Sequence, residues 1–345
     1  MARCDLTVRG GGIFGLSIAW EAARRGARVR LIETVAIGAG SSGGLVGALA
    51  PHVPENWNDK KQFQLESLLM AEAFLTTASA ASGLPTGYAR TGRLQPIADA
   101  AALTLAQTRA RAAASLWGNH AQWQVIPTTG GAWQPASPTG HLIHDSLSAL
   151  IHPRLTLLAL AEAIRTTGGE VLIGNADDHG PTVHATGTAG LQDLSAAMGH
   201  KVGDGVKGQA ILLQHNAATM PQLFTDTLHV IPHLNGTVAI GSTSERDWAH
   251  PTSTDAQLDA LLTRARAALP VLQDAPVIER WAALRPRAQS RAPLLGPWPG
   301  RPGHYVANGG FKIGFGMAPN VAKVMVDLVL TGIDAIPAGF NTAAL

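Results

Sequence analysis

The first residues of the chain alternate between short apolar runs and a helical pattern. Residues 5–8 form an apolar run of the length that is typical of a buried parallel strand. Apolar side chains then recur at helical spacing at Leu16, Ala19, Trp20 and Ala23. Gly26 follows as the expected end of that helix, and a second apolar run, residues 29–32, leads directly to Glu33. This pattern predicts a β-α-β unit at the start of an α/β fold.

The turn between the first strand and the helix reads G-x-G-x-x-G. The first glycine permits a tight turn, the second lets the backbone approach a pyrophosphate, and the third lets helix and strand pack closely. Glu33 stands at the end of the second strand, where a carboxylate can accept hydrogen bonds from both ribose hydroxyls, which argues against NADP. The unit predicts dinucleotide binding by Gly10, Gly12, Ile13, Phe14, Gly15 and Glu33.

A long loop rich in glycine and serine follows the second strand. Residues 36–52 read AIGAGSSGGLVGALAPH, whereas a simple NAD-binding domain would usually continue with another helix. Serine hydroxyls in this loop can bind a phosphate, and the small residues after them can run beneath a flat ring system. The loop therefore favours FAD over NAD, with candidate contacts at Ser41, Ser42, Gly47, Ala48 and Leu49.

The same loop contains a hydrolase-like motif, because Gly40, Ser42 and Gly44 satisfy G-x-S-x-G. That nucleophile elbow needs a strand immediately before the serine and a helix immediately after it. Residues 37–40 have no strand pattern, and further glycines follow the motif. The sequence therefore argues against an α/β-hydrolase.

Composition excludes several classes of protein. A length of 345 residues predicts about two domains, and 46% apolar with 14% charged residues is typical of a globular protein. The formal net charge is only +2 and the basic residues are scattered, so no nucleic-acid partner is expected. No run approaches the roughly 18 apolar residues of a membrane span, so no transmembrane segment is expected.

Cysteine and histidine restrict the chemistry further. Cys4 is the only cysteine, which excludes an internal disulfide and any C-x-x-C motif. Together with an N-terminus that lacks the apolar core of a signal peptide, it predicts a cytoplasmic protein. His141 and His144 come nearest to a metal-ligand pair, but they lie in a strand-like segment, so no metal site is expected. Arg9, a charge at the end of a buried strand, either reaches solvent or lies near a cofactor.

Further segments stand in the order of a known family of flavoenzymes. They are residues 90–97, 151–171, 183–187, 206–213, 230–248, 281–297 and 304–332. Together with the N-terminal unit, these segments resemble the D-amino-acid oxidase superfamily, which includes glycine oxidase, D-amino-acid dehydrogenases and sarcosine-oxidase-like enzymes. Independently of the resemblance, Asn235-Gly236 between two apolar runs predicts a β-hairpin.

The resemblance implies a two-domain α/β fold. A Rossmann-like FAD-binding domain of the glutathione-reductase type is expected to be interleaved with a substrate domain, an α+β unit built on an antiparallel sheet. The expected boundaries place the FAD-binding domain at residues 1–85, 140–202 and 296–345. They place the substrate domain at residues 86–139 and 203–295.

Residues 304–332 resemble the closing cofactor motif of the family. Pro319 is expected to begin a helix that runs to about Leu330, and Gly332 to end it. If the start of that helix points at a flavin, its partial positive charge stabilises the negative charge of the reduced ring. The FAD contacts implied in this part of the chain are Thr186, Gly187, Gly309, Gly310, Phe311, Lys312 and Gly314.

Two features depart from the pattern of the relatives. Several relatives hold FAD covalently through a cysteine near the C-terminus or a histidine in the serine-glycine loop. Here the only cysteine is Cys4 and the matching loop position is Gly44, so the FAD is expected to be non-covalent. Amine-oxidising relatives also carry histidine, tyrosine and arginine where this chain has Gly310, Phe311 and Lys312. That difference leaves the substrate, and the activity itself, open.

The resemblance implies oxidation of a small amino acid or related amine by hydride transfer from its α-carbon to FAD, giving an imine that water hydrolyses. Arg285 occupies the place of the carboxylate-binding arginine of the family, and its planar fork can hold a carboxylate at two points. Lys312 is the expected second cation and His52 a further candidate for the active site. Oxygen or a quinone would accept the electrons. The alternatives are an FAD-dependent hydroxy-acid or polyol-phosphate dehydrogenase and a non-catalytic FAD-binding subunit.

Overall fold

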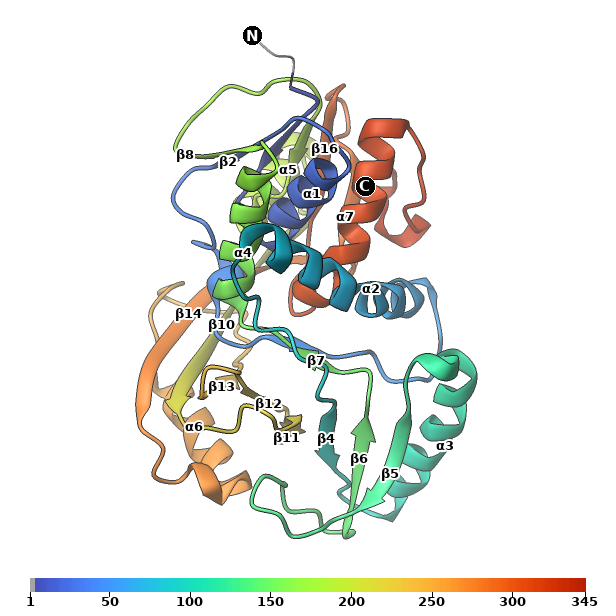
Figure 1. Cartoon of the computed structure of the whole chain (residues 1–345), viewed down its shortest axis with the longest axis vertical. Coiled ribbons are helices and arrows are strands. Elements are labelled where there is room, and N and C mark those ends of the chain that lie inside the picture. The colour runs from blue at the N-terminus through green and yellow to red at the C-terminus, as the bar shows by residue number, and fades with distance from the viewer. Residues whose placement is uncertain (1–3) are drawn as a thin grey trace.

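Two large β-sheets lie one above the other along the long axis of the molecule (Figure 1). The computed structural model describes residues 4–345. A six-stranded sheet forms the upper half in this view and an eight-stranded sheet the lower half. A two-stranded sheet of β3 (Ala48–Leu49) and β7 (Ala149–Leu150) lies between them.

The six-stranded sheet is mostly parallel, in the strand order β15-β16-β9-β1-β2-β8. The five strands from β16 to β8 run parallel to one another, and β15 pairs with β16 in the antiparallel direction. The strands are β1 (Leu6–Arg9), β2 (Val29–Glu33), β8 (Glu170–Ile173), β9 (Thr182–His184), β15 (Leu294–Pro297) and β16 (His304–Asn308). With α1 (Ile13–Arg24) between them, β1 and β2 confirm the predicted β-α-β unit.

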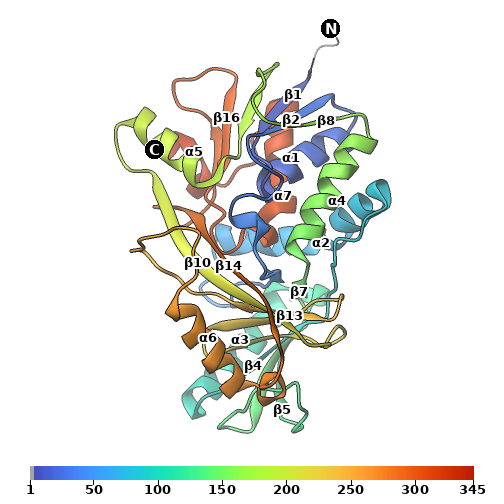
Figure 2. The same cartoon turned by 90° about the vertical axis from the view of Figure 1, so that its left-hand side faces the viewer.

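Helices cover both faces of this sheet (Figure 2). On one face lie α1, α2 (Asp59–Ser82), α4 (Pro153–Thr166) and α7 (Gly314–Thr331), and on the other lies α5 (Gly187–Met198). Because α1 packs against α4 and α7 as well as the sheet, every residue from 13 to 23 is buried. Glu21 is the one charge among these residues, and it is paired with Arg24 and Arg25.

The eight-stranded sheet has the order β14-β10-β13-β12-β11-β4-β6-β5. All neighbours are antiparallel except β11 and β4. The strands are β4 (Arg93–Pro96), β5 (Trp123–Pro127), β6 (His141–Asp145), β10 (Gly203–Gln214), β11 (Gln222–Thr225), β12 (Leu228–Pro232), β13 (Thr237–Gly241) and β14 (Val277–Ala288). The sheet is flanked by α3 (Ala100–Leu116) beside β5 and by α6 (Ala256–Ala268) against β10 and β13.

Two long strands connect the halves of the molecule. β10 and β14 have 12 residues each and pair along their whole length, from Gly203 opposite Ala288 to Leu213 opposite Val277. Their upper ends contact α5, and their lower ends belong to the eight-stranded sheet (Figure 2). Side chains on β14 can therefore reach the space between the two sheets.

Local residue preferences explain several element ends, and they confirm the predicted end of the last helix and the predicted hairpin. Pro153 is the first residue of α4, where its missing N–H costs no helical hydrogen bond. Gly332 ends α7 in the left-handed conformation, with φ of 76°. Asn235-Gly236 forms the turn between β12 and β13, which pair with Pro232 opposite Val238.

The predicted start of the last helix is wrong. α7 begins at Gly314, and Pro319 lies inside it. The N–H of Met317 already donates to the carbonyl of Ile313, so the helical ladder is closed before the proline is reached. Because Pro319 has no N–H, it only omits one bond to the carbonyl four residues earlier. Gly314 is thus part of the first helical turn and not of a loop.

Two strands differ from the expected domain boundaries. Residues 140–202 were assigned to the FAD-binding domain, but β6 within that range pairs with β4 and β5 of the eight-stranded sheet. β15 starts in the range 203–295 that was assigned to the substrate domain, yet it pairs with β16 in the six-stranded sheet. Sheet membership depends on which distant strand supplies the hydrogen bonds, and a local apolar pattern does not specify that partner.

Candidate active site

Three helices begin at one edge of the six-stranded sheet without a capping side chain. α1, α5 and α7 follow the carboxyl ends of the neighbouring parallel strands β1, β9 and β16. None of the three has a side-chain cap at its first residue or an acidic residue in its first turn. The other helices, α2, α3, α4 and α6, are capped by the side chains of Asn58, Asp99, His152 and Asp255. The edge therefore presents partial positive charge and backbone N–H groups to an anionic ligand, with the N–H of Ile13 already donating to the Ser42 hydroxyl.

The glycines of the first turn are required by close contacts. Gly10 has φ of 112°, and a Cβ there would lie 2.3 Å from the carbonyl oxygen of Ala185. A Cβ at Gly15 would lie 2.0 Å from the carbonyl oxygen of Gly10, so only glycine lets α1 approach β1 this closely. The turn after β1 is thus in direct contact with the turn after β9, where Thr186 precedes α5.

Glu33 and Ser42 lie against the same turn. The Glu33 carboxylate accepts hydrogen bonds from the N–H of Gly11 at 2.7 Å and of Val35 at 2.9 Å. The Ser42 hydroxyl accepts one from the N–H of Ile13 at 3.1 Å. Ser41–Gly43 forms a 3₁₀ turn with no strand directly before it, so the hydrolase elbow is absent.

The glycine segment before α7 also meets the first turn of α1. A Cβ at Gly310 would lie 2.9 Å from the Phe14 ring, and one at Gly314 would lie 3.6 Å from Ile13. Gly309 has φ of 76° and the non-glycine Phe311 has φ of 43°, so the backbone turns sharply here. The two glycine-rich segments, about 300 residues apart in the chain, therefore form one continuous backbone surface.

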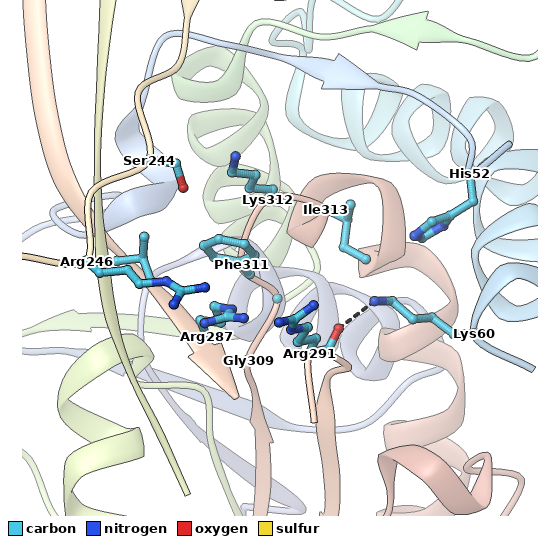
Figure 3. A pocket seen from close by; sticks show the side chains of 12 residues that line it. His52, Lys60, Ser244, Arg246, Arg287, Arg291, Gly309, Phe311, Lys312 and Ile313 are labelled. Carbon is cyan, nitrogen blue, oxygen red and sulfur yellow. Dashed lines mark hydrogen bonds between the residues drawn. The ribbon is translucent and has the colours of Figure 1, made fainter. Parts of the chain in front are cut away.

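A cavity of about 370 Å³ opens between this surface and the eight-stranded sheet (Figure 3). One wall is the segment 309–313. His52 and Lys60 border it near the start of α2, and Ser244, Arg246 and β14 border it from the eight-stranded sheet. Its size lies within the range of about 300–1,000 Å³ that is usual for small-molecule sites.

A family model described as FAD dependent oxidoreductase (DAO) matches residues 5–328 of this chain. The chain belongs to the DAO family of FAD-dependent oxidoreductases. The glycine oxidase of Pseudomonas aeruginosa is 34% identical over 125 residues, and this match spans only 36% of the chain and 34% of that relative's own length. The glycine oxidase of Geobacillus kaustophilus is 25% identical over 370 residues, covering 95% of the chain and 93% of the relative.

Solved structures share the fold of this DAO-family protein. The glycine oxidase structure from Geobacillus kaustophilus aligns with a TM-score of 0.83 at 21% identity and covers 99% of this chain and 98% of that one. An iminodiacetate oxidase from Chelativorans sp. BNC1 aligns with a TM-score of 0.85 at 20% identity and covers 97% and 98%. At such identities the likeness shows the fold alone.

The residues of this DAO-family protein fit FAD. The starts of α1 and α5 supply backbone N–H donors for a diphosphate. The glycines beside them carry no Cβ that would block its approach. Glu33 lies at the expected ribose position at the end of β2. Packing alone requires glycine at position 47, with or without the cofactor, because a Cβ on Gly47 would lie 1.9 Å from the Ile151 carbonyl oxygen. Arg9 pairs with Asp178 at 2.6 Å in the turn before β9, so its charge is balanced by a carboxylate.

Two of the three predicted catalytic residues line the cavity. Lys312 and His52 both border it, together with Phe311. The Nδ1 of His52 lies 2.5 Å from Oε1 of Gln64, and burial lowers the pKa of the imidazole, which keeps it neutral at pH 7. Burial also lowers the pKa of Lys312, and the nearby charge of Arg285 lowers it further.

Arg285 is buried beside the cavity but does not border it. Its guanidinium donates to the Ser242 hydroxyl at 2.6 Å and to the carbonyls of Thr243 and Lys207 at 2.5 and 3.3 Å. Burial lowers its pKa to about 10. The guanidinium lies 5.6 Å from the centre of the Phe311 ring, which does border the cavity. Arg285 is therefore one side chain away from the space where a substrate would bind.

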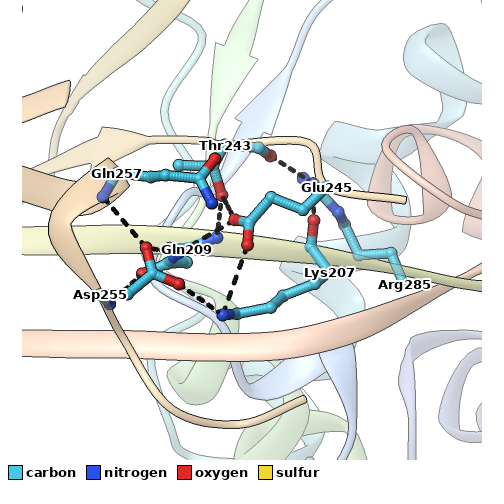
Figure 4. A network of polar contacts seen from close by, with 7 residues as sticks. All are labelled: Lys207, Gln209, Thr243, Glu245, Asp255, Gln257 and Arg285. Carbon is cyan, nitrogen blue, oxygen red and sulfur yellow. Dashed lines mark hydrogen bonds and ion pairs between the residues drawn. The ribbon is translucent and has the colours of Figure 1, made fainter. Parts of the chain in front are cut away.

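A buried polar network fixes the segment that holds Arg285 (Figure 4). The Lys207 ammonium, only 3% exposed, lies 2.9 Å from Asp255 and 3.3 Å from Glu245. Gln209 donates to both carboxylates, and the hydroxyl of Thr243 contacts Glu245. The two residues adjacent to Glu245, at positions 244 and 246, border the cavity. The network thus positions one wall of the site.

Several cavity residues were not predicted from the sequence. They are Lys60, Ser244, Arg246, Arg287 and Arg291. For Arg287 a signal existed, because it lies two residues after Arg285 on a strand, and such residues share a face.

Among residues 4–345 no group of three or more histidine, cysteine, aspartate or glutamate side chains could hold a metal ion. In the same part of the chain, no helix combines the length and the apolar character that crossing a membrane requires.

Proposed function

We propose that this chain oxidises a small amino acid or a related amine with a non-covalently bound FAD. Bound FAD supplies the hydride acceptor for the α-carbon, and the imine product is hydrolysed by water to a keto acid and an amine. The observation that carries the proposal is the position of the cavity. It lies between the segment 309–313, which packs against the first turn of α1, and a wall of cationic side chains.

The cationic wall suits an amino-acid substrate in two ways. Lys312 supplies positive charge for the carboxylate at the cavity itself, and the buried charge of Arg285 adds to it from beside the Phe311 ring. The same charges lower the pKa of a substrate ammonium, because like charges disfavour its protonated form. A neutral amine can lose a hydride from its α-carbon far more easily than an ammonium. Because water can take the proton of an ammonium whose pKa is lowered, no side chain is assigned as a general base.

Further support comes from the relatives and from the only cysteine. The relatives named above are a glycine oxidase and an iminodiacetate oxidase, both enzymes that act on small amines. Cys4 hydrogen-bonds to the carbonyl of Leu6 at the amino end of β1 and does not border the cavity. It therefore offers no covalent attachment to FAD there. The proposal includes oxygen or a quinone as electron acceptor and a cytoplasmic location, which suits a chain with a single cysteine.

Anaerobic reduction of the bound flavin tests the proposal. The visible spectrum of the purified protein, before and after acid precipitation, reports whether FAD is present and whether it is released. Glycine, sarcosine, proline, D-amino acids and 2-hydroxy acids are then added in turn. Bleaching by at least one amine supports the proposal. Bleaching by hydroxy acids alone would favour a hydroxy-acid dehydrogenase, and bleaching by none would favour a non-catalytic subunit.

Substitution of Arg285 tests its role. Arg285→Ala should lower kcat/KM about 100-fold, because it removes a positive charge beside the cavity. It also removes charge-assisted hydrogen bonds, each worth about 1.5–3 kcal/mol, that hold Ser242 and Thr243 near the cavity. Arg280→Ala is the matched control, since Arg280 lies on the same strand but pairs with Asp259 on the exposed surface. Flavin content and circular dichroism show whether the Arg285 variant folds. A folded, flavin-bound variant with unchanged kinetics would remove the assignment.

A further inference from the structure

The cavity carries more positive charge than one substrate carboxylate requires. Five cationic side chains border it: Lys60, Arg246, Arg287, Arg291 and Lys312. None of the described residues that line it is an aspartate or a glutamate. In Figure 3, the guanidinium groups of Arg246 and Arg287 lie below the Phe311 ring and the Lys312 ammonium lies above it. The positive charge is thus spread along the cavity and not gathered at one point.

These arginines differ from those elsewhere in the chain. Eleven arginines of the described part of the chain form ion pairs with carboxylates. Within residues 4–345, the guanidinium groups that make neither a hydrogen bond nor an ion pair belong to Arg246, Arg287, Arg291 and Arg301. Three of these four border the cavity. Unpaired guanidinium groups therefore concentrate at this one site.

The free guanidinium groups come from separate elements. Arg246 follows β13, Arg287 is on β14, and Arg291 lies in the turn before β15, where its carbonyl accepts a hydrogen bond from Lys60 at 2.5 Å. The fold has to bring these three places together to gather the three guanidinium groups. Their mutual repulsion destabilises the ligand-free cavity, and the charge of Arg291 contributes to a lowered pKa of Lys60, after burial. A bound anion removes that repulsion.

We propose that the substrate of this site is an amine that bears two anionic groups, a carboxylate at the reacting carbon and a second carboxylate or phosphate-like group. This inference rests on the proposed amine oxidation. Lys312 serves the first carboxylate, with the charge of Arg285 beside the cavity adding to its field. Arg246, Arg287 and Arg291 serve the second anion. Guanidinium groups suit this task because they bind carboxylate and phosphate oxygens with two parallel hydrogen bonds.

The diphosphate of the cofactor does not account for these cations. The free N–H groups that suit a diphosphate lie at the starts of α1 and α5, beside Gly10 and Thr186. Arg287 instead belongs to β14 of the eight-stranded sheet, and Arg246 lies in the segment that follows β13 of the same sheet. Flavin content nevertheless has to be measured for each variant, so that loss of FAD is not mistaken for loss of substrate.

A matched series of secondary amines tests the inference on the flavin-bound protein. N-propylglycine carries one anion, N-(2-carboxyethyl)glycine adds a carboxylate, and N-(2-phosphonoethyl)glycine adds a phosphonate at the same position. We expect kcat/KM for one of the two doubly anionic amines to exceed that for N-propylglycine about tenfold to 100-fold. The excess should shrink as ionic strength rises. The better of the two identifies the second group.

Variants locate the second anion. Arg246→Gln and Arg291→Gln remove exposed charges, so neither is expected to disturb the core. Each should reduce the ratio of kcat/KM between the doubly and the singly anionic amine about tenfold. Arg301→Gln is the control, because Arg301 is equally unpaired but lies over the Trp298 ring outside the cavity. It should leave the ratio unchanged.

Binding without turnover gives a second readout. Calorimetry with glutarate and butyrate compares two anions with one, and only wild type and Arg301→Gln should prefer glutarate. Equal kcat/KM for all three amines on the flavin-bound protein would overturn the inference while leaving amine oxidation intact. Variants that lose activity only because they lose FAD, with the preference unchanged, would remove Arg246 and Arg291 from the site of the second anion. If no amine reduces the flavin, the proposed function fails instead, and glutarate binding still decides whether the site selects two anions.

Discussion

Substitution of Gly10 by alanine separates close contact from backbone strain. Alanine at φ of 112° is strained by about 1–2 kcal/mol. Its Cβ would also lie 2.3 Å from the Ala185 carbonyl oxygen, roughly 1 Å closer than a normal contact, so β1 and β9 would have to shift. Overpacking of this kind costs a further 1–3 kcal/mol, roughly. We expect Gly10→Ala to lower the free energy of unfolding by about 2–5 kcal/mol.

Gly26 provides the matched control, because it has a similar φ of 89° but nothing within 4 Å of its Cβ position. Gly26→Ala should cost only the strain, about 1–2 kcal/mol. Urea denaturation followed by circular dichroism measures both variants. FAD titration should show weakened binding, at least about tenfold, only for Gly10→Ala, because only that substitution displaces the turn at Thr186. Equal destabilisation and equal FAD affinity in the two variants would refute the reasoning.

Two further predictions concern the buried polar groups. Lys207→Met leaves the buried carboxylate of Glu245 without its cationic partner and should lower the free energy of unfolding, measured by urea denaturation, by about 3 kcal/mol. Lys201→Met, in an exposed ion pair, should lower it by less than about 1 kcal/mol, and similar losses in the two variants would contradict the role of the buried pair. Burial lowers the pKa of three histidines to about 4, 3 and 3; they are His184, His229 and His233. The unfolded chain protonates these three imidazoles from about pH 6.5 downward, whereas the folded chain keeps them neutral. The free energy of unfolding should therefore decrease by about 4 kcal/mol for each unit by which the pH is lowered near pH 5. A thermal midpoint that stays constant from pH 7 to 4.5 would exclude this.

Much of the nucleotide-binding half could be predicted because its signals are local. The apolar run, the helical spacing and the glycine turn of the β-α-β unit are set by backbone conformation within about 30 residues. The hairpin at Asn235-Gly236 and the end of α7 at Gly332 follow from the same short-range preferences. Family resemblance extended these local signals to the order of the whole chain, which the structural comparisons bear out for the fold.

The sequence by itself determined the glycine turn after the first strand, a second glycine-rich segment and two candidate cations, Arg285 and Lys312. Only the tertiary structure decided that β6 joins the eight-stranded sheet, that α7 starts before Pro319, and that Arg285 lies behind the cavity wall. It alone gathered Arg246, Arg287 and Arg291 around one cavity. The physical reason is distance along the chain. Strand pairing and charge clustering depend on segments 40 or more residues apart, whose contacts no local preference encodes.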